Sequence, residues 1–531
     1  MKKFLESASV ALGVATIYLS ALVGPLVSPE HATVYHWSSS AAELFIPTIL
    51  DFCIFWMVLT LSCLLARKPG RVRVAVWSGM IFFIPAVVLE TRGQLHGTVV
   101  SHQLLVRLFT VTLVAWLLLV ITWRPAFEAK FEAVVAFASL IFVFASIGGL
   151  AILPELAWFG WQARSLNAQM PLHHSVAAQS KSAGKPRIIW IVFDELSYEQ
   201  VYERRFPGLQ LPAFDQLASQ AAVFTHTIPA GMLTQHVLPS LMTGDPVDNS
   251  RASADGQVLL IHNPDTKAWQ KFDEHKSVFQ DALNAGYSTA VAGWYNPYCR
   301  ILPEVLDRCF WAYDDIMPNG MLPSATTLQA NMLEPLRSEV GTGLAFRFLP
   351  FFRQIPDEDD RASELHIADY KSLVDAVDKV LKDPSANFVL LHMAAPHLPG
   401  IYNRATGKFA LSHSSYIDNL ALTDKCLAHI RSKLEENHEW DSSAIVIMGD
   451  HSWRTFSWRN TAGWTKEDEA ASQGGKFDDR PAYIVKLPQE RKGALIATPF
   501  AALNTRKLLD ALLTQNIRST EDLSVWAQQR R

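Results

Sequence analysis

Residues 187–195 read Arg-Ile-Ile-Trp-Ile-Val-Phe-Asp-Glu, an unbroken run of large apolar side chains that ends in two acids. A short run of β-branched and aromatic residues without polar alternation is typical of a strand buried on both faces, as in a parallel sheet covered by helices. A second run of this kind, Ala444–Met448, is followed by Gly449-Asp450-His451. The two stretches predict an α/β domain in which acids and a histidine follow the carboxyl ends of strands.

The rest of the chain after residue 186 alternates short apolar runs with helical patterns, which favours a central, mostly parallel sheet flanked by helices. Further strands are predicted at Phe388–His392 and Tyr483–Leu487, and helices at Phe214–Ala222, Ser277–Ala285, Ala368–Leu381 and Asp418–Leu434. The threonine-rich segment Thr234–Gly244 is predicted to be a turn. In sheets of this kind, sites form beyond the carboxyl ends of the strands.

The first 155 residues predict a transmembrane bundle of five helices. Apolar stretches of about 20 residues, enough to cross ~30 Å of hydrocarbon, lie at 7–27, 44–66, 73–90, 104–123 and 132–153. The basic residues near the ends of these stretches are unevenly divided between the two sides. One side has eight: Lys2, Lys3, Arg67, Lys68, Arg71, Arg73, Arg124 and Lys130. The other has two, Arg92 and Arg107. The positive-inside rule therefore predicts a cytoplasmic N-terminus, and five crossings place the chain beyond residue 155 outside.

This topology predicts three segments: a transmembrane domain at 1–155, a linker at 156–185 and an extracytoplasmic catalytic domain at 186–531. Outside the cytoplasm, an oxidising compartment would allow Cys299 and Cys309, which lie close together in the sequence, to form a disulfide. A net charge of −4 provides no basic face for nucleic acid, so no nucleic-acid partner is expected.

Several motifs occur in one order along the second segment. They are Asp194-Glu195, the segment from Thr234 to Gly244, His392-Met-Ala-Ala-Pro-His397, Gly449-Asp450-His451 and the closing stretch 480–488. In order and spacing these motifs resemble the alkaline phosphatase superfamily in its sulfatase-like branch, over residues 186–490. Together with the apolar N-terminal third, the chain looks like the membrane-bound bacterial phosphoethanolamine and phosphoglycerol transferases, the group that includes lipoteichoic acid synthases.

The resemblance implies one divalent metal ion, Zn²⁺ or Mn²⁺, with Asp194, Asp450 and His451 as ligands. It also implies that Thr234 is the nucleophile and a ligand of the metal, and Glu195 is a further candidate ligand. Carboxylate oxygens and an imidazole nitrogen suit these ions. A hydroxyl group bound to such an ion loses its proton more easily than a free threonine does, so it becomes a nucleophile.

Other residues are candidates for binding the substrate. His397 matches a family histidine that contacts the transferred group, whereas His392 is expected mainly to support the end of its strand. The transferases often have another histidine shortly after the Asp-His pair, and this chain has none there. Arg454, Arg459 and Lys476 are the candidates to replace it.

The chain departs from the sulfatases at the nucleophile. Sulfatases have Cys or Ser there, with Pro two residues on and Arg four residues on, whereas this chain has Thr234, His236 and Leu238. Threonine carries a methyl group on Cβ and cannot be oxidised to the sulfatase aldehyde, so sulfate-ester hydrolysis by the usual route is not expected. The sulfatase Gly-Lys-Trp-His stretch is also missing, since Gly293 precedes Trp294-Tyr295-Asn296. The alternative nucleophiles near Thr234 are Thr225, Thr227, Ser240 and Thr243.

Taken with the resemblance, these features predict a multi-pass transferase of the bacterial cytoplasmic membrane, with its catalytic domain periplasmic or extracellular. It would move phosphoethanolamine or phosphoglycerol from a membrane phospholipid to an envelope glycan or lipid through a phosphothreonine. Two alternatives stay open: a membrane-anchored phosphodiesterase or sulfatase-like hydrolase that uses water, and an inactive, membrane-tethered binding module. The sequence does not determine the head group, the acceptor, the metal or the oligomeric state.

Overall fold

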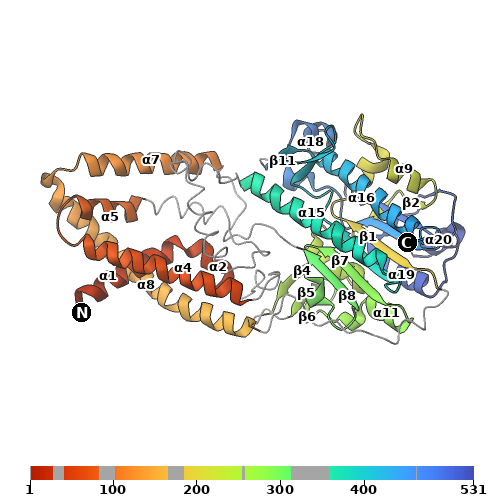
Figure 1. Ribbon diagram of the computed structural model, residues 1–531, viewed down its shortest axis with the longest axis horizontal. Helices are drawn as coiled ribbons and strands as arrows, with labels where there is room; N and C mark the ends of the chain where they lie inside the picture. Colours follow the sequence, from red (N-terminus) through yellow and green to blue (C-terminus); the bar gives the residue numbers. More distant parts are fainter. Residues whose placement is uncertain are drawn as a thin grey trace. The chain divides into compact units, whose positions relative to one another are not determined.

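The computed structural model describes residues 2–27, 41–82, 102–164, 185–253, 258–312, 358–461 and 463–530. Contacts between residues divide the chain into two compact units, one that holds the N-terminal helices and one that holds the α/β domain (Figure 1). Most of the expected linker, from residue 165 to 184, lies outside the described residues, as does 83–90 of the third apolar stretch.

The N-terminal unit consists of helices that follow the apolar stretches. They are α1 (Lys2–Tyr18), α2 (Ser20–Val27), α4 (Ala42–Leu65), α5 (Arg71–Phe82), α7 (His102–Ile121), the short helix η1 (Pro125–Phe127) and α8 (Glu128–Ala163). Two of the described helices, α4 and α8, are long and apolar enough to cross a membrane, and Thr110–Ile121 is a shorter apolar segment. The expected first span is divided between α1 and α2, and five crossings stay a prediction.

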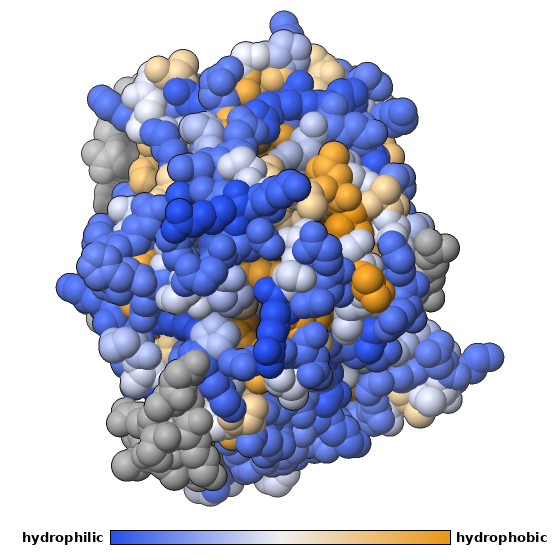
Figure 2. Space-filling view, turned by 90° about the vertical axis from the view of Figure 1, so that its right-hand side faces the viewer, coloured by the Kyte–Doolittle hydropathy of each residue, from blue (hydrophilic) through white to orange (hydrophobic). Residues whose placement is uncertain are grey.

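The two units present very different surfaces. Helix α8 exposes large apolar side chains along much of its length, among them Phe137, Leu140, Phe144, Ile147 and Leu150. A contiguous apolar surface of this kind is unfavourable in water and marks a contact with lipid or protein. The face of the α/β domain in Figure 2 is mainly hydrophilic. Helix α8 therefore exposes more apolar surface than the face of the α/β domain shown in Figure 2.

The α/β domain is built on one eight-stranded sheet. Across the sheet its strands are β14 (Ala494–Ile496), β2 (Ala222–Phe224), β13 (Tyr483–Lys486), β12 (Ala444–Gly449), β1 (Ile188–Phe193), β9 (Phe388–Met393), β7 (Thr289–Trp294) and β8 (Arg308–Ala312). The five strands from β12 to β8 pair in parallel, and β13 is antiparallel to both β12 and β2. This arrangement confirms the predicted mostly parallel sheet.

The register of the central strands brings the ends of β12, β1 and β9 to one edge. Phe193, the last residue of β1, lies opposite Gly449 of β12 and Met393 of β9. Asp194 follows β1 and Asp450 follows β12, so these two residues are neighbours in space. All six residues of each of these three strands are buried, in agreement with their unbroken apolar pattern.

Helices cover both faces of the sheet (Figure 1). Ile189 and Ile191 of β1 share a core with Phe214 of α9 (Pro212–Ala218), Leu373 of α15 (Glu358–Lys382) and Leu427 of α16 (Tyr416–Glu436). On the other face, Phe279 of α11 (Val278–Asn284) lies edge-on to Phe388 of β9, with ring centroids 5.4 Å apart. This face is also covered by α19 (Thr505–Leu513), whose first residue forms a hydrogen bond with the hydroxyl group of Tyr483 of β13.

Shorter elements complete the domain. The strands are β3 (Thr227–Ile228) with β15 (Phe500–Ala501), β4 (Asn249–Ala252) with β5 (Leu259–Asn263) and β6 (Ala268–Lys271), and β10 (Gly400–Asn403) with β11 (Lys408–Ser414). The helices are η3 (Glu199–Glu203), η4 (Glu274–Lys276), α12 (Tyr298–Ile301), α17 (Thr455–Trp458), α18 (Lys466–Ala471), η5 (Ala502–Asn504) and α20 (Thr520–Gln528).

The segment Thr234–Gly244 is a helix, and the prediction of a turn was wrong. Helix α10 spans Thr234–Thr243 and ends at Gly244, whose φ of +75° is the left-handed conformation that glycine adopts most easily. Threonine and proline are weak helix formers, which explains the prediction. Burial of an apolar face that includes Leu238 and Leu241 outweighs this local preference.

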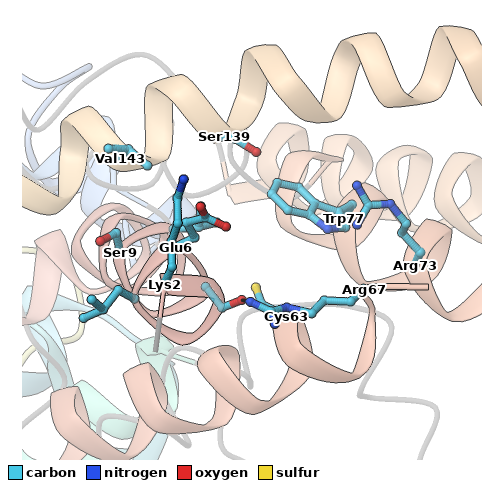
Figure 3. A pocket seen from close by; sticks show the side chains of 12 residues that line it. Lys2, Glu6, Ser9, Cys63, Arg67, Arg73, Trp77, Ser139 and Val143 are labelled. Atoms are coloured by element: carbon cyan, nitrogen blue, oxygen red, sulfur yellow. Dashed lines mark hydrogen bonds between the residues drawn. The ribbon is translucent and has the colours of Figure 1, made fainter. Parts of the chain in front are cut away.

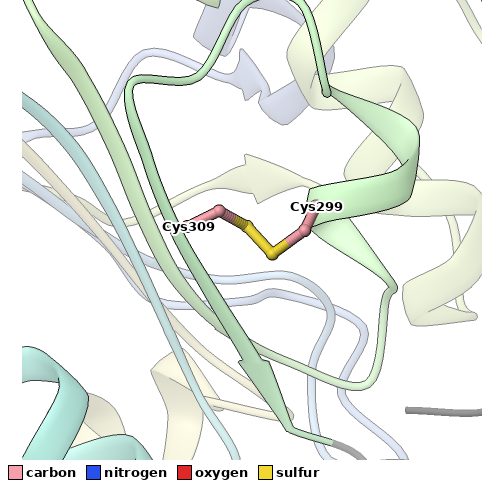
Figure 4. Close-up of a disulfide and its surroundings, with 2 residues drawn as sticks. All are labelled: Cys299 and Cys309. Carbon is pink, nitrogen blue, oxygen red and sulfur yellow. A yellow bond between two sulfur atoms is a disulfide. The ribbon is translucent and has the colours of Figure 1, made fainter. Parts of the chain in front are cut away.

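Cys299 of α12 and Cys309 of β8 form a disulfide (Figure 4). The bond closes a loop of ten residues and ties α12 to the strand next to β7. Cys53, Cys63 and Cys426 are free.

Cys299 and Cys309 should resist a thiol reagent in the unreduced, denatured protein, because their sulfur atoms are bonded to each other. Intact mass should show three labels, from the three free cysteines, before reduction and five after it. Five labels before reduction would contradict the pairing. Replacing both residues with serine should lower the free energy of unfolding by about 2–3 kcal/mol, because the unfolded chain becomes less constrained.

Candidate functional site

Three buried side chains meet at the carboxyl edge of the sheet. Asp194 follows β1, whereas Asp450 and His451 follow the neighbouring strand β12. Their potential ligand atoms all lie within 4.8 Å of one another. His451 Nε2 is 3.2 Å from Asp450 Oδ2 and 3.9 Å from Asp194 Oδ1. We call Asp194, Asp450 and His451 the acidic cluster.

The donor atoms of the acidic cluster fit a divalent cation. Asp194 Oδ1 and Asp450 Oδ2 are buried and have no hydrogen-bond partner within the described residues, a costly state for carboxylate oxygens. Burial, and next the neighbouring Asp450, raise the pKa of Asp194 well above its usual value. Nδ1 of His451 lies 3.1 Å from the carbonyl oxygen of Ser452. Because a carbonyl only accepts, Nδ1 carries the proton and Nε2 presents a lone pair to the cluster.

Thr234 joins the acidic cluster from a different element. Its Oγ1 atom donates a hydrogen bond to Asp194 Oδ2 at 3.0 Å and lies 3.4 Å from His451 Nε2. Thr234 is also the first residue of α10. The start of a helix presents free N–H groups and the positive end of the helix dipole, both of which favour an anion. The hydroxyl therefore lies where a phosphoryl group and a cation would both be stabilised.

Three of the four other hydroxyl groups considered as nucleophiles make hydrogen bonds elsewhere, and the fourth, that of Thr227, has no partner among the described residues. Ser240 and Thr243 donate to carbonyl oxygens within α10, each at 2.8 Å. Thr225 Oγ1 lies 2.7 Å from Nδ1 of His226. Thr227 is buried on β3. Among the described residues, none of these four hydroxyl groups contacts the acidic cluster.

Glu195 directs its carboxylate away from the acidic cluster. Its φ of +65° lies in the left-handed region, which is uncommon for a residue with a side chain. The carboxylate accepts hydrogen bonds from Arg454 Nε at 2.6 Å and from Trp458 Nε1 at 3.0 Å. The backbone N–H of Glu195 donates to Asp450 Oδ1 at 3.1 Å. Glu195 therefore orients Asp450 and anchors Arg454.

Arg454 links Glu195 to His397. Its Nη2 atom lies 3.1 Å from Nε2 of His397, and its Nη1 donates to the carbonyl oxygen of Met232, two residues before Thr234. A guanidinium only donates, so Nε2 accepts and the proton of His397 lies on Nδ1. Burial, and next the charge of Arg454, lower the pKa of His397 well below its usual value and keep the ring neutral. Its Nδ1 atom is buried, and by distance and angle it has no hydrogen-bond partner among the described residues.

His392 supports Asp194. This fully buried residue of β9 places Nε2 3.6 Å from Asp194 Oδ2, and its Nδ1 lies 2.8 Å from the hydroxyl oxygen of Tyr298. Burial lowers the pKa of His392 to about 4, so the imidazole is neutral. Tyr298 fits because Gly293 has no side chain: a Cβ atom there would lie 2.3 Å from the tyrosine ring. Sequence reasoning missed Tyr298, although its neighbour Cys299 was singled out.

An aromatic wall lies beside these histidines. The ring of Trp294, the last residue of β7, is 5.1 Å from His397, 5.2 Å from His366 and 6.4 Å from His392, measured between centroids. Trp458 lies 5.1 Å from His397. In the sequence, Trp294 stands out only as a departure from the sulfatase pattern. The apolar run 289–294 was the missed signal, because it predicts another strand that ends at the same edge.

Among the basic residues after His451, Arg454 is the one at the site. The side chain of Lys476 is exposed and makes no hydrogen bond or ion pair with the acidic cluster in the described part of the chain. Arg459 pairs instead with Glu469.

Comparison with family models identifies the family of the α/β domain. The family model for Sulfatase matches residues 186–499, more than half of the chain. The chain therefore belongs to the Sulfatase family, and the resemblance to the sulfatase-like branch of the alkaline phosphatase superfamily is confirmed. No curated protein matches the chain by sequence.

Similar solved structures include a hydrolase and a synthase. Ps i-CgsB in complex with k-i-k-neocarrahexaose is 17% identical, with 64% of this chain and 75% of that chain covered and a TM-score of 0.41. For the phosphonate monoester hydrolase SpPMH from Silicibacter pomeroyi, the corresponding values are 13%, 65%, 77% and 0.37. For the lipoteichoic acid synthase LtaP from Listeria monocytogenes they are 13%, 64%, 74% and 0.37.

Asp450→Asn should abolish binding of a divalent metal, because it replaces a charged, buried oxygen donor with a neutral amide. Elemental analysis of the purified full-length protein measures metal per chain. We expect chelation to remove the metal from the wild-type protein, and Zn²⁺ or Mn²⁺ to restore it.

Glu304→Gln is the matched control. Glu274, His275 and Glu304 form a second group with ligand-like spacing among the described residues, on the exposed surface. This variant should keep the metal content of the wild-type protein. Full metal content in Asp450→Asn, or equal loss in both variants, would show that the acidic cluster is not the metal site.

Proposed function

We propose that this chain is a metal-dependent membrane transferase that moves phosphoethanolamine or phosphoglycerol from a membrane phospholipid to an envelope glycan or lipid. One observation carries the proposal: Thr234 Oγ1 lies 3.0 Å from Asp194 and 3.4 Å from His451, inside a set of donors that fits a divalent cation. A threonine hydroxyl can attack phosphorus but cannot form the sulfatase aldehyde. The site therefore favours phosphorus chemistry over the hydrolysis of sulfate esters.

The first displacement follows from the contacts of Thr234. The Thr234 hydroxyl donates its hydrogen bond to Asp194 Oδ2, so a lone pair of Oγ1 is free to face phosphorus. The Oγ1–P bond forms as the bond from phosphorus to the diacylglycerol oxygen breaks, and diacylglycerol leaves with a proton. A divalent ion on Asp194, Asp450 and His451 would supply positive charge to the reacting phosphoryl group. The product on the protein is a phosphothreonine.

The second displacement restores Thr234. An acceptor hydroxyl attacks the phosphothreonine, the Oγ1–P bond breaks, and the acceptor proton returns to the threonine oxygen. We assign the phosphoryl oxygens to the N–H groups at the N-terminus of α10, and His397 remains our candidate for contact with the transferred group. Water in place of the acceptor would make the protein a hydrolase.

We further propose that the protein is a multi-pass protein of the bacterial cytoplasmic membrane, with segments at 1–155, 156–185 and 186–531. The length of α4 and α8, the apolar surface of α8 and the asymmetry of basic residues support this placement. The Cys299–Cys309 disulfide supports an oxidising compartment for the α/β domain.

Thr234→Ala should remove turnover while the fold and metal content persist, because the nucleophilic oxygen is lost. We expect a loss of several powers of ten in rate, on the order of 4–8 kcal/mol in the barrier. Thr234→Ser should keep part of the activity, since its oxygen survives and only the methyl group that restricts χ1 is lost. Turnover of phosphatidylethanolamine and phosphatidylglycerol, measured as released diacylglycerol, checks both variants.

Thr243→Ala removes another hydroxyl of the same helix and should retain most of the turnover. Intact mass after incubation with each lipid should show a phosphoethanolamine or phosphoglycerol adduct on Thr234, which names the transferred group. Normal turnover in Thr234→Ala, or an adduct on a neighbouring hydroxyl, would refute the assigned nucleophile. Release of diacylglycerol at the same rate with and without any acceptor would favour the hydrolase.

A reporter that is active only in the cytoplasm should be silent when it is fused after Arg531, because the basic residues retain the opposite loops inside. The same reporter inserted between α4 and α5, beside Lys68, should be active. Activity in cells that express each fusion at equal levels is the measurement. A strongly active C-terminal fusion would overturn the proposed orientation.

A further inference from the structure

The N-terminal unit contains a cavity of about 700 Å³ between α1, α4, α5 and α8. Figure 3 shows that side chains from these four helices surround it. Its lining is polar at one end, where α1 and α5 begin and α4 ends, and apolar along the helices. No residue of the proposed catalytic site contributes to it.

The polar end carries an excess of positive charge. Lys2, Arg67 and Arg73 line the cavity together with one acid, Glu6. Arg73 is already neutralised by Glu132, which it binds through two hydrogen bonds of 2.6 and 2.7 Å. Arg67 donates to the hydroxyl of Ser7 at 3.1 Å. Neither Arg67 nor Lys2 forms an ion pair with a carboxylate among the described residues, so Arg67 has further N–H groups to offer an anion.

The apolar part of the cavity reaches the outer surface of the helices. Leu5 and Val143 line it and are 55% and 43% exposed. Trp77, which is buried, forms another part of the wall. Phe144 and Ile147 continue the exposed apolar surface along α8. A ligand that satisfies both parts must carry an anionic group and a long apolar chain.

We infer that this cavity, which we call the basic pocket, binds an anionic phospholipid. The phosphate lies against Arg67 and Lys2, and an acyl chain follows Leu5 and Val143 along α8. Basic pockets between membrane helices bind anionic head groups in this way, because cations at the bilayer surface attract them. Under the proposed orientation, the bound lipid belongs to the cytoplasmic leaflet, opposite the side of the catalytic domain. The lipid bridges four helices and is not the donor of the transferred group.

Native mass spectrometry of the full-length protein in detergent tests this inference. The probe is phosphatidic acid, which has no head-group alcohol to transfer, and phosphatidylcholine with the same acyl chains is the neutral reference. One phosphatidic acid should remain bound per chain, in excess over phosphatidylcholine. Arg67→Gln should lower the bound fraction about fivefold, as expected when one cation near the lipid phosphate is lost.

Lys68→Gln is the matched control, because it removes the neighbouring charge, which is exposed and does not line the basic pocket. It should bind phosphatidic acid as the wild-type protein does. Arg67→Lys keeps the charge and should retain most of the binding, which separates loss of charge from loss of fold. Binding is read by mass and not by turnover, so the result does not depend on the proposed transferase activity.

Three results would overturn the inference. Equal retention of phosphatidic acid by Arg67→Gln and the wild-type protein would exclude the basic pocket as the site. Equal losses in Arg67→Gln and Lys68→Gln would indicate general attraction to a basic surface. Binding of inorganic phosphate alone, with displacement of phosphatidic acid, would assign the pocket to a soluble anion.

Discussion

The burial of two carboxylates at one edge of the sheet governs the architecture of the site. Asp194 and Asp450 follow adjacent parallel strands, and both are fully buried. Part of the cost of this arrangement is met locally, because the N–H groups of Glu195 and His451 donate to Asp450 and the Thr234 hydroxyl donates to Asp194. One oxygen of each acid still has no partner among the described residues. A divalent cation held by Asp194, Asp450 and His451 would satisfy these oxygens and offset the repulsion between the two acids.

A layer of contacts outside the acidic cluster limits the geometries that it can adopt. Tyr298 forms a hydrogen bond with His392, which lies against Asp194. The disulfide of the adjacent Cys299 fixes α12 on β8. On the opposite side, Glu195 anchors Arg454, and Arg454 in turn fixes the ring of His397. Because burial keeps both histidines neutral, they carry no positive charge that would compete with a metal ion for the carboxylates. The proposed chemistry depends on neutral histidines beside carboxylates that would hold the metal.

The helical unit meets a different constraint. Its helices expose apolar side chains that would be unfavourable in water, whereas the α/β domain presents a mainly hydrophilic face. The acyl chains of lipid can cover the apolar surface, but they carry no charge and cannot neutralise cations at the helix ends. Arg73 is therefore paired with Glu132 inside the protein, and the cations of the basic pocket retain capacity for an anion. In these proposals the chain binds phosphate groups at two separate sites. The site at Thr234 reacts with its phosphate group, whereas the basic pocket only binds one.

Local sequence pattern determined the strands and the residues that follow them. Short, unbroken apolar runs rich in β-branched residues are typical of central strands, so β1, β9 and β12 and the positions of Asp194, Asp450 and His451 could be predicted from sequence. The order of motifs in the resemblance also selected Thr234. Tertiary structure decided the remainder, because it depends on contacts between distant segments. Burial of an apolar face makes 234–243 a helix despite weak propensity, and the path of the chain after β12 brings Arg454, and not Lys476, back to Glu195. The side chains of Tyr298 and Trp294 reach the histidines because β7 lies beside β9, a pairing of strands 99 positions apart that no local pattern encodes.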